Sequence, residues 1–164
     1  MITQQLLKHF LNYDPETGYF TWRVRTSNRI NIGTIAGTVD TNGYLRIRVC
    51  GKVRAAHRLV WLYVHGYFPE GDIDHVDGNR LNNALYNLRE CNRSQNLLNK
   101  PIQDNNVTGV KGVCWDKRRQ KWEAYAKHQN KKIHIGRFEN FDDAVRARKE
   151  YINNNYDMSF YREK

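Results

Sequence analysis

The sequence predicts an α+β protein made of two small domains. Segments that alternate between apolar and polar residues, as strands do, are interleaved with segments whose apolar residues recur at helical spacing. The 164 residues suffice for two small domains. A polar stretch rich in breakers begins at Pro101, so we expect an N-terminal domain at 1–100, a linker at 101–107 and a C-terminal domain at 108–157.

The first elements are short and separated by turns. Ile2–Leu11 is a helix candidate. A turn follows at 14–18, because Pro15 presets φ and Gly18 accepts a positive φ. Tyr19–Val24 then alternates as a strand.

A hairpin and a buried helix come next. The strand candidates Gly33–Val39 and Tyr44–Val49 flank Thr41-Asn42-Gly43, which is a favourable hairpin turn. The segment Arg54–Gly66, RAAHRLVWLYVHG, is apolar and free of breakers until its last residue. We therefore expect a buried helix that ends at Gly66.

The following stretch predicts a strand–loop–strand–helix unit. Ile73–His75 and Leu88–Cys91 are brief strands, and the loop between them begins with a tight turn at Asp77-Gly78-Asn79. Arg93–Asn99 is a helix whose N-cap residue is Asn92.

The C-terminal domain predicts three strands and one helix. The strands are Gly109–Asp116, Lys121–Lys127 and Lys132–Phe138, and the helix is Phe141–Asn155. Apolar positions such as Trp122 face the helix, which packs through Ala144, Ala147 and Tyr151. The opposite face collects Lys121, Glu123, Tyr125, Lys127, Lys132, His134 and Arg137. Such a basic and aromatic face fits a groove of duplex DNA, although a solvated sheet face has the same pattern.

The charge distribution favours nucleic acid as a partner. The net charge is +10 and the aromatic content is 12%. Between Thr108 and Arg137 there are nine Lys and Arg residues against two acids, Asp116 and Glu123. A cationic surface also aids solubility, but the concentration of charge in one short region indicates a dedicated binding face.

Cysteine usage and hydropathy point to the cytoplasm. Cys50, Cys91 and Cys114 are far apart and form no Cys-x-x-Cys pair, so we expect neither a disulfide framework nor a cysteine zinc site. No stretch reaches 18 uninterrupted apolar residues, and the first residues carry too short an apolar run for a secretory signal.

Asp74 and His75 have side chains suited to phosphodiester hydrolysis. This reaction needs an activated water, which a neutral imidazole supplies, and stabilisation of developing charge, which a divalent cation supplies. Oxygen ligands such as Asp74 and Asn96 suit Mg²⁺. An isolated Asp-His pair more often opens a turn, with the neighbouring asparagines satisfying loop backbone.

The wider segment resembles the HNH endonucleases of phages, especially the homing-endonuclease branch. The resemblance is carried by HRLVW (57–61), DHVDGNRLNNALYNLREC (74–91) and NRSQN (92–96), and YDPETGYFTW (13–22) looks like the leader of such proteins. It covers most of residues 1–100 and implies a ββα-metal core at about 72–99.

The resemblance implies roles for single residues. His75 would be the general base, Asp74 and Asn96 would bind one divalent ion, Mg²⁺ or Mn²⁺, and Asn87 would brace the loop and orient the histidine. Apart from the resemblance, we also expect Arg89 to contact phosphate, although an exposed strand arginine is the plainer interpretation. The resemblance also implies the cytoplasm of a host cell as the place of action.

The C-terminal stretch resembles the AP2/ERF DNA-binding domain, which is found appended to phage HNH proteins. The matching marks are Val-Lys-Gly-Val, Lys-Trp-x-Ala, Ile-Gly-x-Phe and the helix Asp-Ala-x-x-Ala-Arg. The resemblance implies that the sheet enters the major groove, with contacts from Lys111, Cys114, Tyr125, Lys127, Lys132 and His134. We add Arg118 and Arg119, in the turn before the second strand, to the expected DNA contacts.

Together these observations predict an HNH homing-type nickase that hydrolyses duplex DNA as a monomer or weak dimer, with no membrane and no small-molecule substrate. The main alternative is a non-catalytic, sequence-specific DNA-binding regulator that uses the AP2-like sheet. A structural RNA-binding protein is a weaker alternative that no sequence feature favours.

Overall fold

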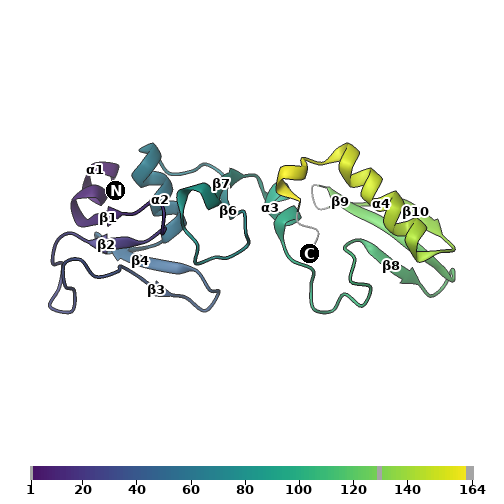
Figure 1. The fold of residues 1–164 in the computed structure, drawn as a ribbon, viewed down its shortest axis with the longest axis horizontal. Helices are drawn as coiled ribbons and strands as arrows, with labels where there is room; N and C mark the ends of the chain where they lie inside the picture. Colours follow the sequence, from purple (N-terminus) through teal and green to yellow (C-terminus); the bar gives the residue numbers. More distant parts are fainter. Residues whose placement is uncertain (1, 129–130, 162–164) are drawn as a thin grey trace. The chain divides into compact units, whose positions relative to one another are not determined.

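The computed structural model of the chain describes residues 2–128 and 131–161. By its internal contacts the chain divides into two compact units, Met1–Cys91 and Asn92–Lys164 (Figure 1). This division lies before the 101–107 segment that we predicted as the linker, and each unit is described by itself. Among the described residues, none of the helices has the length and apolar character needed to span a bilayer.

The first unit contains three small antiparallel sheets and two α-helices. The sheets have the strand orders β1-β2, β3-β4-β5 and β6-β7. The elements are α1 Gln4–Phe10, β1 Leu11–Tyr13, β2 Phe20–Trp22, β3 Thr38–Val39, β4 Leu45–Val49, β5 Lys52–Ala55, α2 Ala56–His65, β6 Asp72–His75, a 3₁₀ turn Leu85–Asn87 and β7 Leu88–Cys91.

The predicted hairpin is present, but the predicted start of its first strand and the predicted start of the following helix were wrong. The Asp40 carboxylate accepts hydrogen bonds from the backbone N–H groups of Asn42 and Tyr44 and closes the turn between β3 and β4. The strand expected at Gly33–Val39 is reduced to its last two residues, β3. The buried helix begins at Ala56, because Arg54 and Ala55 pair with β4 as part of β5.

The core of the first unit lies between α1, α2 and the strands. Phe20, Leu7, Ile47, Leu59 and Val60 have no exposed surface. Each aliphatic side chain buried in this way stabilises the fold by about 1.5–3 kcal/mol. Gly66, at φ 86°, ends α2 in the left-handed conformation, as predicted.

In its described residues, 92–128 and 131–161, the second unit contains one three-stranded antiparallel sheet with the strand order β10-β9-β8 and a long helix, α4, packed on it (Figure 1). It begins with α3, where the Asn92 side chain and Gln95 form a capping box. The elements are α3 Arg93–Asn99, β8 Val113–Asp116, β9 Lys121–His128, β10 Lys131–Phe138, α4 Phe141–Asn155 and a 3₁₀ turn Met158–Phe160.

The two faces of this sheet differ as predicted. Val113, Ala124 and Ala144 are buried between the sheet and α4, with Trp122 packed against them. Along α4 the buried residues are Ala144, Arg148 and Ile152, so the predicted helix stripe through Ala147 and Tyr151 was wrong by one position. The first strand begins at Val113 and not at Gly109.

Candidate active site and candidate DNA-binding face

The pairing of β6 with β7 places Asp74 and His75. Asp74 lies opposite Arg89, and His75 lies opposite Leu88. The guanidinium of Arg58, on α2, donates to the carbonyls of Gly71 and Pro69 at 3.0 and 2.8 Å, which fixes the segment before β6. The strand β6, which ends at His75, is therefore fixed at its start by Arg58 and along its length by pairing with β7.

His75 lies in a buried, largely aromatic environment. Its side chain is 4% exposed, and its Nε2 lies 3.3 Å from Oδ1 of Asn83. The rings of His57 and Tyr44 lie 5.2 and 6.1 Å from the imidazole, measured between centroids. The amide of Asn83 donates from Nδ2 to the carbonyl of Leu81 at 3.1 Å, so its oxygen is the atom that faces the histidine.

This environment favours the uncharged imidazole. Burial lowers the pKa of His75 below its ordinary value and outweighs the hydrogen bond with Asn83 and the carboxylates of Asp77 and Asp74, which raise it. Burial, with repulsion from His75 as the next cause, lowers the pKa of His57 to about 3. Both rings are therefore neutral at pH 7.

Asn87 braces the loop that follows His75. Its Oδ1 accepts from the backbone N–H of Asp77 at 3.0 Å, and its Nδ2 donates to the Asp77 carboxylate and the Asn82 carbonyl at 2.9 and 2.8 Å. The backbone carbonyl of Asn87 also accepts from Val76 at 2.9 Å. The side chain of Asn83, in contrast to that of Asn87, lies within hydrogen-bond distance of the imidazole.

The N-terminal leader supports the same loop. Tyr13 donates from its hydroxyl to the carbonyl of Asn83 at 2.9 Å. Gly18 has φ 74°, and a Cβ there would lie 2.2 Å from the backbone nitrogen of Ala84. A glycine at 18 therefore permits the close approach that brings the leader against the loop. The leader was recognised only by resemblance, so this contact was not predicted, and nothing in the sequence distinguished Asn83 from the neighbouring asparagines.

Asp74 is paired with Arg89. The guanidinium donates from Nε and Nη2 to the same carboxylate oxygen at 2.9 and 2.7 Å, and the Asp74 side chain is 7% exposed. Arg89, an expected phosphate contact, thus holds the expected metal ligand. Asn96 lies on α3 in the second unit. In the described part of the chain no group of three or more His, Cys, Asp or Glu side chains is placed to bind a metal.

The outer face of the second sheet is organised around Glu123. Its carboxylate accepts from Lys132 at 2.7 Å and from His134 at 3.1 Å, and Arg137 lies 3.8 Å away. Arg137 belongs to this face because a bulge between His134 and Gly136 shifts the register of β10, so that Arg137 pairs with Glu123. Lys132, whose hydrogen bond is the largest cause, and His134 together lower the pKa of Glu123.

The remaining expected DNA contacts divide between this face and other positions. Cys114, Tyr125 and Lys127 lie on the face with Glu123, in strand register. Arg118 and Arg119 lie in the exposed turn after β8, where their backbone N–H groups bond Asp116. Lys111 lies before β8, off the sheet, with its Nζ 5.5 Å from the centre of the Tyr161 ring.

Comparisons with known proteins find similarity over the segment that carries this site. Residues 54–98 match the family model of the HNH endonucleases. Protein 3.8 of Escherichia phage T7 is 42% identical over 72 residues, which are 43% of this chain and 60% of that protein. A structure described as DNA binding and cleavage by the HNH homing endonuclease I-HmuI is 27% identical with a TM-score of 0.42, over 56% of this chain and 53% of that one. The chain thus spans less than two thirds of either relative. The segment 54–98, which carries the candidate site, is therefore similar to the HNH endonucleases.

Proposed function

We propose that the protein is a metal-dependent DNA endonuclease of the HNH family, a phage homing-type nickase that hydrolyses phosphodiester bonds in duplex DNA. The observation that carries this proposal is the neutral, buried His75 at the end of β6, held by Asn83 within the segment that matches the HNH family. A neutral imidazole is the protonation state that a general base requires.

The contact with Asn83 selects the basic nitrogen of His75. Because Asn83 Oδ1 is an acceptor, Nε2 of the histidine carries the proton and donates. The lone pair then lies on Nδ1, which accepts a proton from the attacking water. Asn87 contributes by holding the loop that carries Asn83, through its bonds to Asp77 and Asn82.

The cation would be Mg²⁺ or Mn²⁺, held by Asp74 and Asn96. Carboxylate and amide oxygens are hard donors, so this donor set fits either ion. When bound, the ion neutralises charge on the scissile phosphate and stabilises the departing oxygen. Because Arg89 bonds Asp74, the carboxylate would hold the ion while shared with the guanidinium.

The second unit would supply DNA affinity through the outer face of its sheet, in the manner of an AP2/ERF domain. Lys127, Tyr125 and Lys132 lie on that face, together with His134. A single HNH site acts on one strand, so a monomer would nick. Once one unit has bound DNA, the tether raises the effective concentration of the other unit at the same DNA.

A plasmid-nicking assay with and without Mg²⁺ tests this proposal. His75→Ala should abolish nicking and leave DNA binding nearly unchanged, whereas His9→Ala, at an exposed histidine, should leave both unchanged. The Asp74–Arg89 ion pair favours one alternative, a regulator that binds DNA without cutting. Wild-type protein that binds duplex DNA but never nicks it, with any divalent ion, would establish that alternative.

A further inference from the structure

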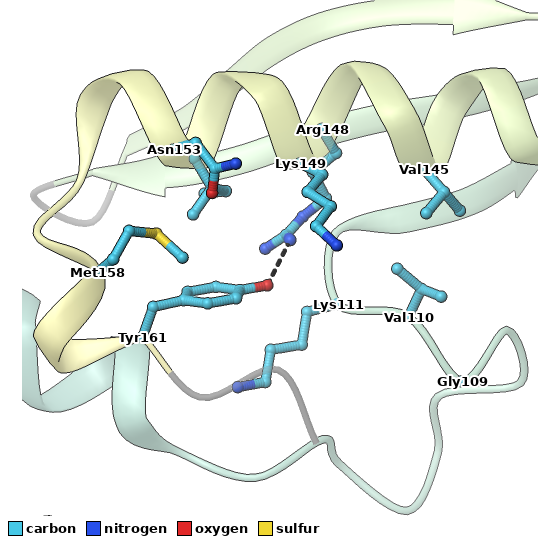
Figure 2. A pocket seen from close by; sticks show the side chains of 10 residues that line it. Gly109, Val110, Lys111, Val145, Arg148, Lys149, Asn153, Met158 and Tyr161 are labelled. Atoms are coloured by element: carbon cyan, nitrogen blue, oxygen red, sulfur yellow. Dashed lines mark hydrogen bonds between the residues drawn. The ribbon is translucent and has the colours of Figure 1, made fainter.

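A cavity of about 250 Å³ lies in the second unit, on the side of the sheet that α4 covers. Figure 2 shows it between α4, the segment that carries Val110 and Lys111, and the residues Met158 and Tyr161. It is therefore separate from the outer sheet face, where Glu123 lies. Neither the HNH domain nor the proposed DNA-binding face uses it.

Arg148 is the buried charged group of this cavity. It is 8% exposed, and its Nη1 donates to the Tyr161 hydroxyl at 2.8 Å. Its Nε has no hydrogen-bond partner among the described residues. Gly112 makes room for the guanidinium, since a Cβ there would lie 2.4 Å from that nitrogen. A buried donor without an acceptor is costly, so an arginine in this position indicates that a ligand supplies one.

The charge around the cavity is of one sign. Lys111 and Lys149 line it together with Arg148, and no acidic side chain is among its lining residues in the described part of the chain. In Figure 2 the Lys149 side chain extends from α4 towards the space around the guanidinium. The Lys111 side chain runs along the other side of the Tyr161 ring, and its Nζ donates to the Leu98 carbonyl at 3.4 Å. Val145 and Ile152 form an apolar wall, which lowers the local dielectric and strengthens attraction for an anion.

We propose that this cavity binds a phosphate monoester, either on a free small molecule such as a nucleotide or on the end of a nucleic acid strand. A guanidinium presents parallel N–H donors that match two oxygens of one phosphate, and the two lysines supply further charge. A phosphate within a duplex backbone would not reach the buried Arg148, whereas a terminal phosphate projects from its carrier. This site does not depend on the proposed nuclease activity.

The test is an NMR titration of the full chain at constant ionic strength. The probes are inorganic phosphate, dAMP, and one duplex oligonucleotide with either a 5′-phosphate or a 5′-hydroxyl. We expect saturable shifts of the Arg148 Nε–H signal and of the Val110 and Lys111 amides. Lys149→Ala, at an exposed residue that leaves the fold intact, should weaken phosphate binding roughly tenfold, as expected for one charge-assisted hydrogen bond. Arg146→Ala, an exposed cation on the same helix, should leave it unchanged.

The probes also distinguish the two sources of phosphate. A preference at these signals for the 5′-phosphorylated duplex over the 5′-hydroxyl duplex would assign the site to strand ends. Binding of inorganic phosphate or dAMP without that preference would assign it to small phosphate compounds. Absence of saturable shifts with every probe, or equal affinity in the wild type and Lys149→Ala, would overturn the proposal.

Discussion

The hydrogen bond between His75 Nε2 and Asn83 Oδ1 determines which imidazole nitrogen carries the proton. Asn83 is itself held by its Nδ2 bond to Leu81 and by the Tyr13 hydroxyl on its carbonyl. It is 1% exposed, so water does not replace the contact readily. Asn83 is therefore a positioning residue for the proposed reaction.

Replacing Asn83 should impair the reaction through the tautomer of His75. Asn83→Ala removes the acceptor at Nε2, and we expect the nicking rate to fall by roughly tenfold or more, the value of one buried hydrogen bond. The ¹⁵N shifts of the His75 ring should show loss of the Nε2-protonated tautomer. Asn12→Ala, at an exposed asparagine on β1, is the control. An unchanged tautomer with a slower reaction would mean that Asn83 acts only through the fold.

His57 makes the stability of the first unit depend on pH. Its pKa falls from 6.5 to about 3 in the folded protein, because burial and the neighbouring His75 disfavour the cation. Between pH 3 and pH 6.5 the unfolded chain therefore binds up to one proton more than the folded protein. Its contribution to stability is complete above pH 6.5 and is lost as the pH falls towards 3.

The substitution His57→Gln should remove this pH dependence. We expect the free energy of unfolding of the wild type to fall more steeply than that of the variant between pH 7 and pH 4.5. Urea unfolding of both proteins at the two pH values measures the difference. The carboxylates that titrate in the same range are common to both proteins and cancel. If the wild type and the variant lose equal stability, His57 does not carry the effect.

For several helices and strands, the sequence patterns predicted the first and last residues correctly. The predicted bounds of β7, α3 and α4 are those observed, because each element has a capping residue, a tight turn or a clear periodicity at its ends. The start of α2 was wrong because Arg54 is as compatible with a strand as with a helix, and its pairing with Ile47 is a tertiary contact. The bulge in β10 left no local signal either.

In the candidate site, too, the sequence predicted what has a local pattern and missed what depends on tertiary contacts. The pattern identified Asp74, His75 and Asn87 as chemically suitable, but it did not show that Asn83 faces the imidazole or that Arg89 binds Asp74. Those contacts depend on how the loop closes, and many asparagines in one loop look alike in sequence. The resemblance identified the leader, but no sequence pattern predicted that Tyr13 and Gly18 contact the loop.

The leader offers a test of how one element supports another. Gly18 and Gly33 both have positive φ, but a Cβ at Gly18 would overlap the backbone of Asn83 and Ala84, whereas nothing lies within 4 Å of the same position at Gly33. Gly33→Ala should therefore cost only the backbone strain, about 1–2 kcal/mol. Gly18→Ala should cost more and also slow nicking, because it displaces the loop that carries Asn83.

Thermal unfolding and nicking assays on the two variants separate these effects. Equal losses of stability, with equal nicking rates, would show that the leader does not support the active-site loop. A larger loss in Gly18→Ala with normal nicking would show that the support is structural only.

At the scale of the whole molecule, the net charge of +10 favours contact with a polyanion, but its effect on DNA depends on which cations are already paired. Glu123 bonds Lys132 and His134 and lies near Arg137, so the centre of the proposed DNA-binding face is less positive than a count of its cations suggests. Within the described part of the chain Lys127, which is exposed on the same face, forms no ion pair with Glu123. Glu123 therefore opposes phosphate binding on the surface that would read DNA.

This arrangement predicts opposite effects from two kinds of substitution. Lys127→Ala combined with Lys132→Ala should weaken DNA binding. The affinity should also fall less steeply with salt concentration, by the amount expected for the loss of roughly one to two phosphate contacts. Glu123→Gln, which keeps an acceptor for Lys132 but removes the negative charge, should tighten binding several-fold at low salt and steepen that dependence. Titration of a fluorescent duplex at several salt concentrations measures both. If Glu123 instead accepts a hydrogen bond from a base, the same variant would bind its preferred sequence more weakly, and binding to unrelated sequences would still tighten. If neither variant changes the salt dependence, the outer sheet face does not contact DNA, and the cations of this unit serve another partner.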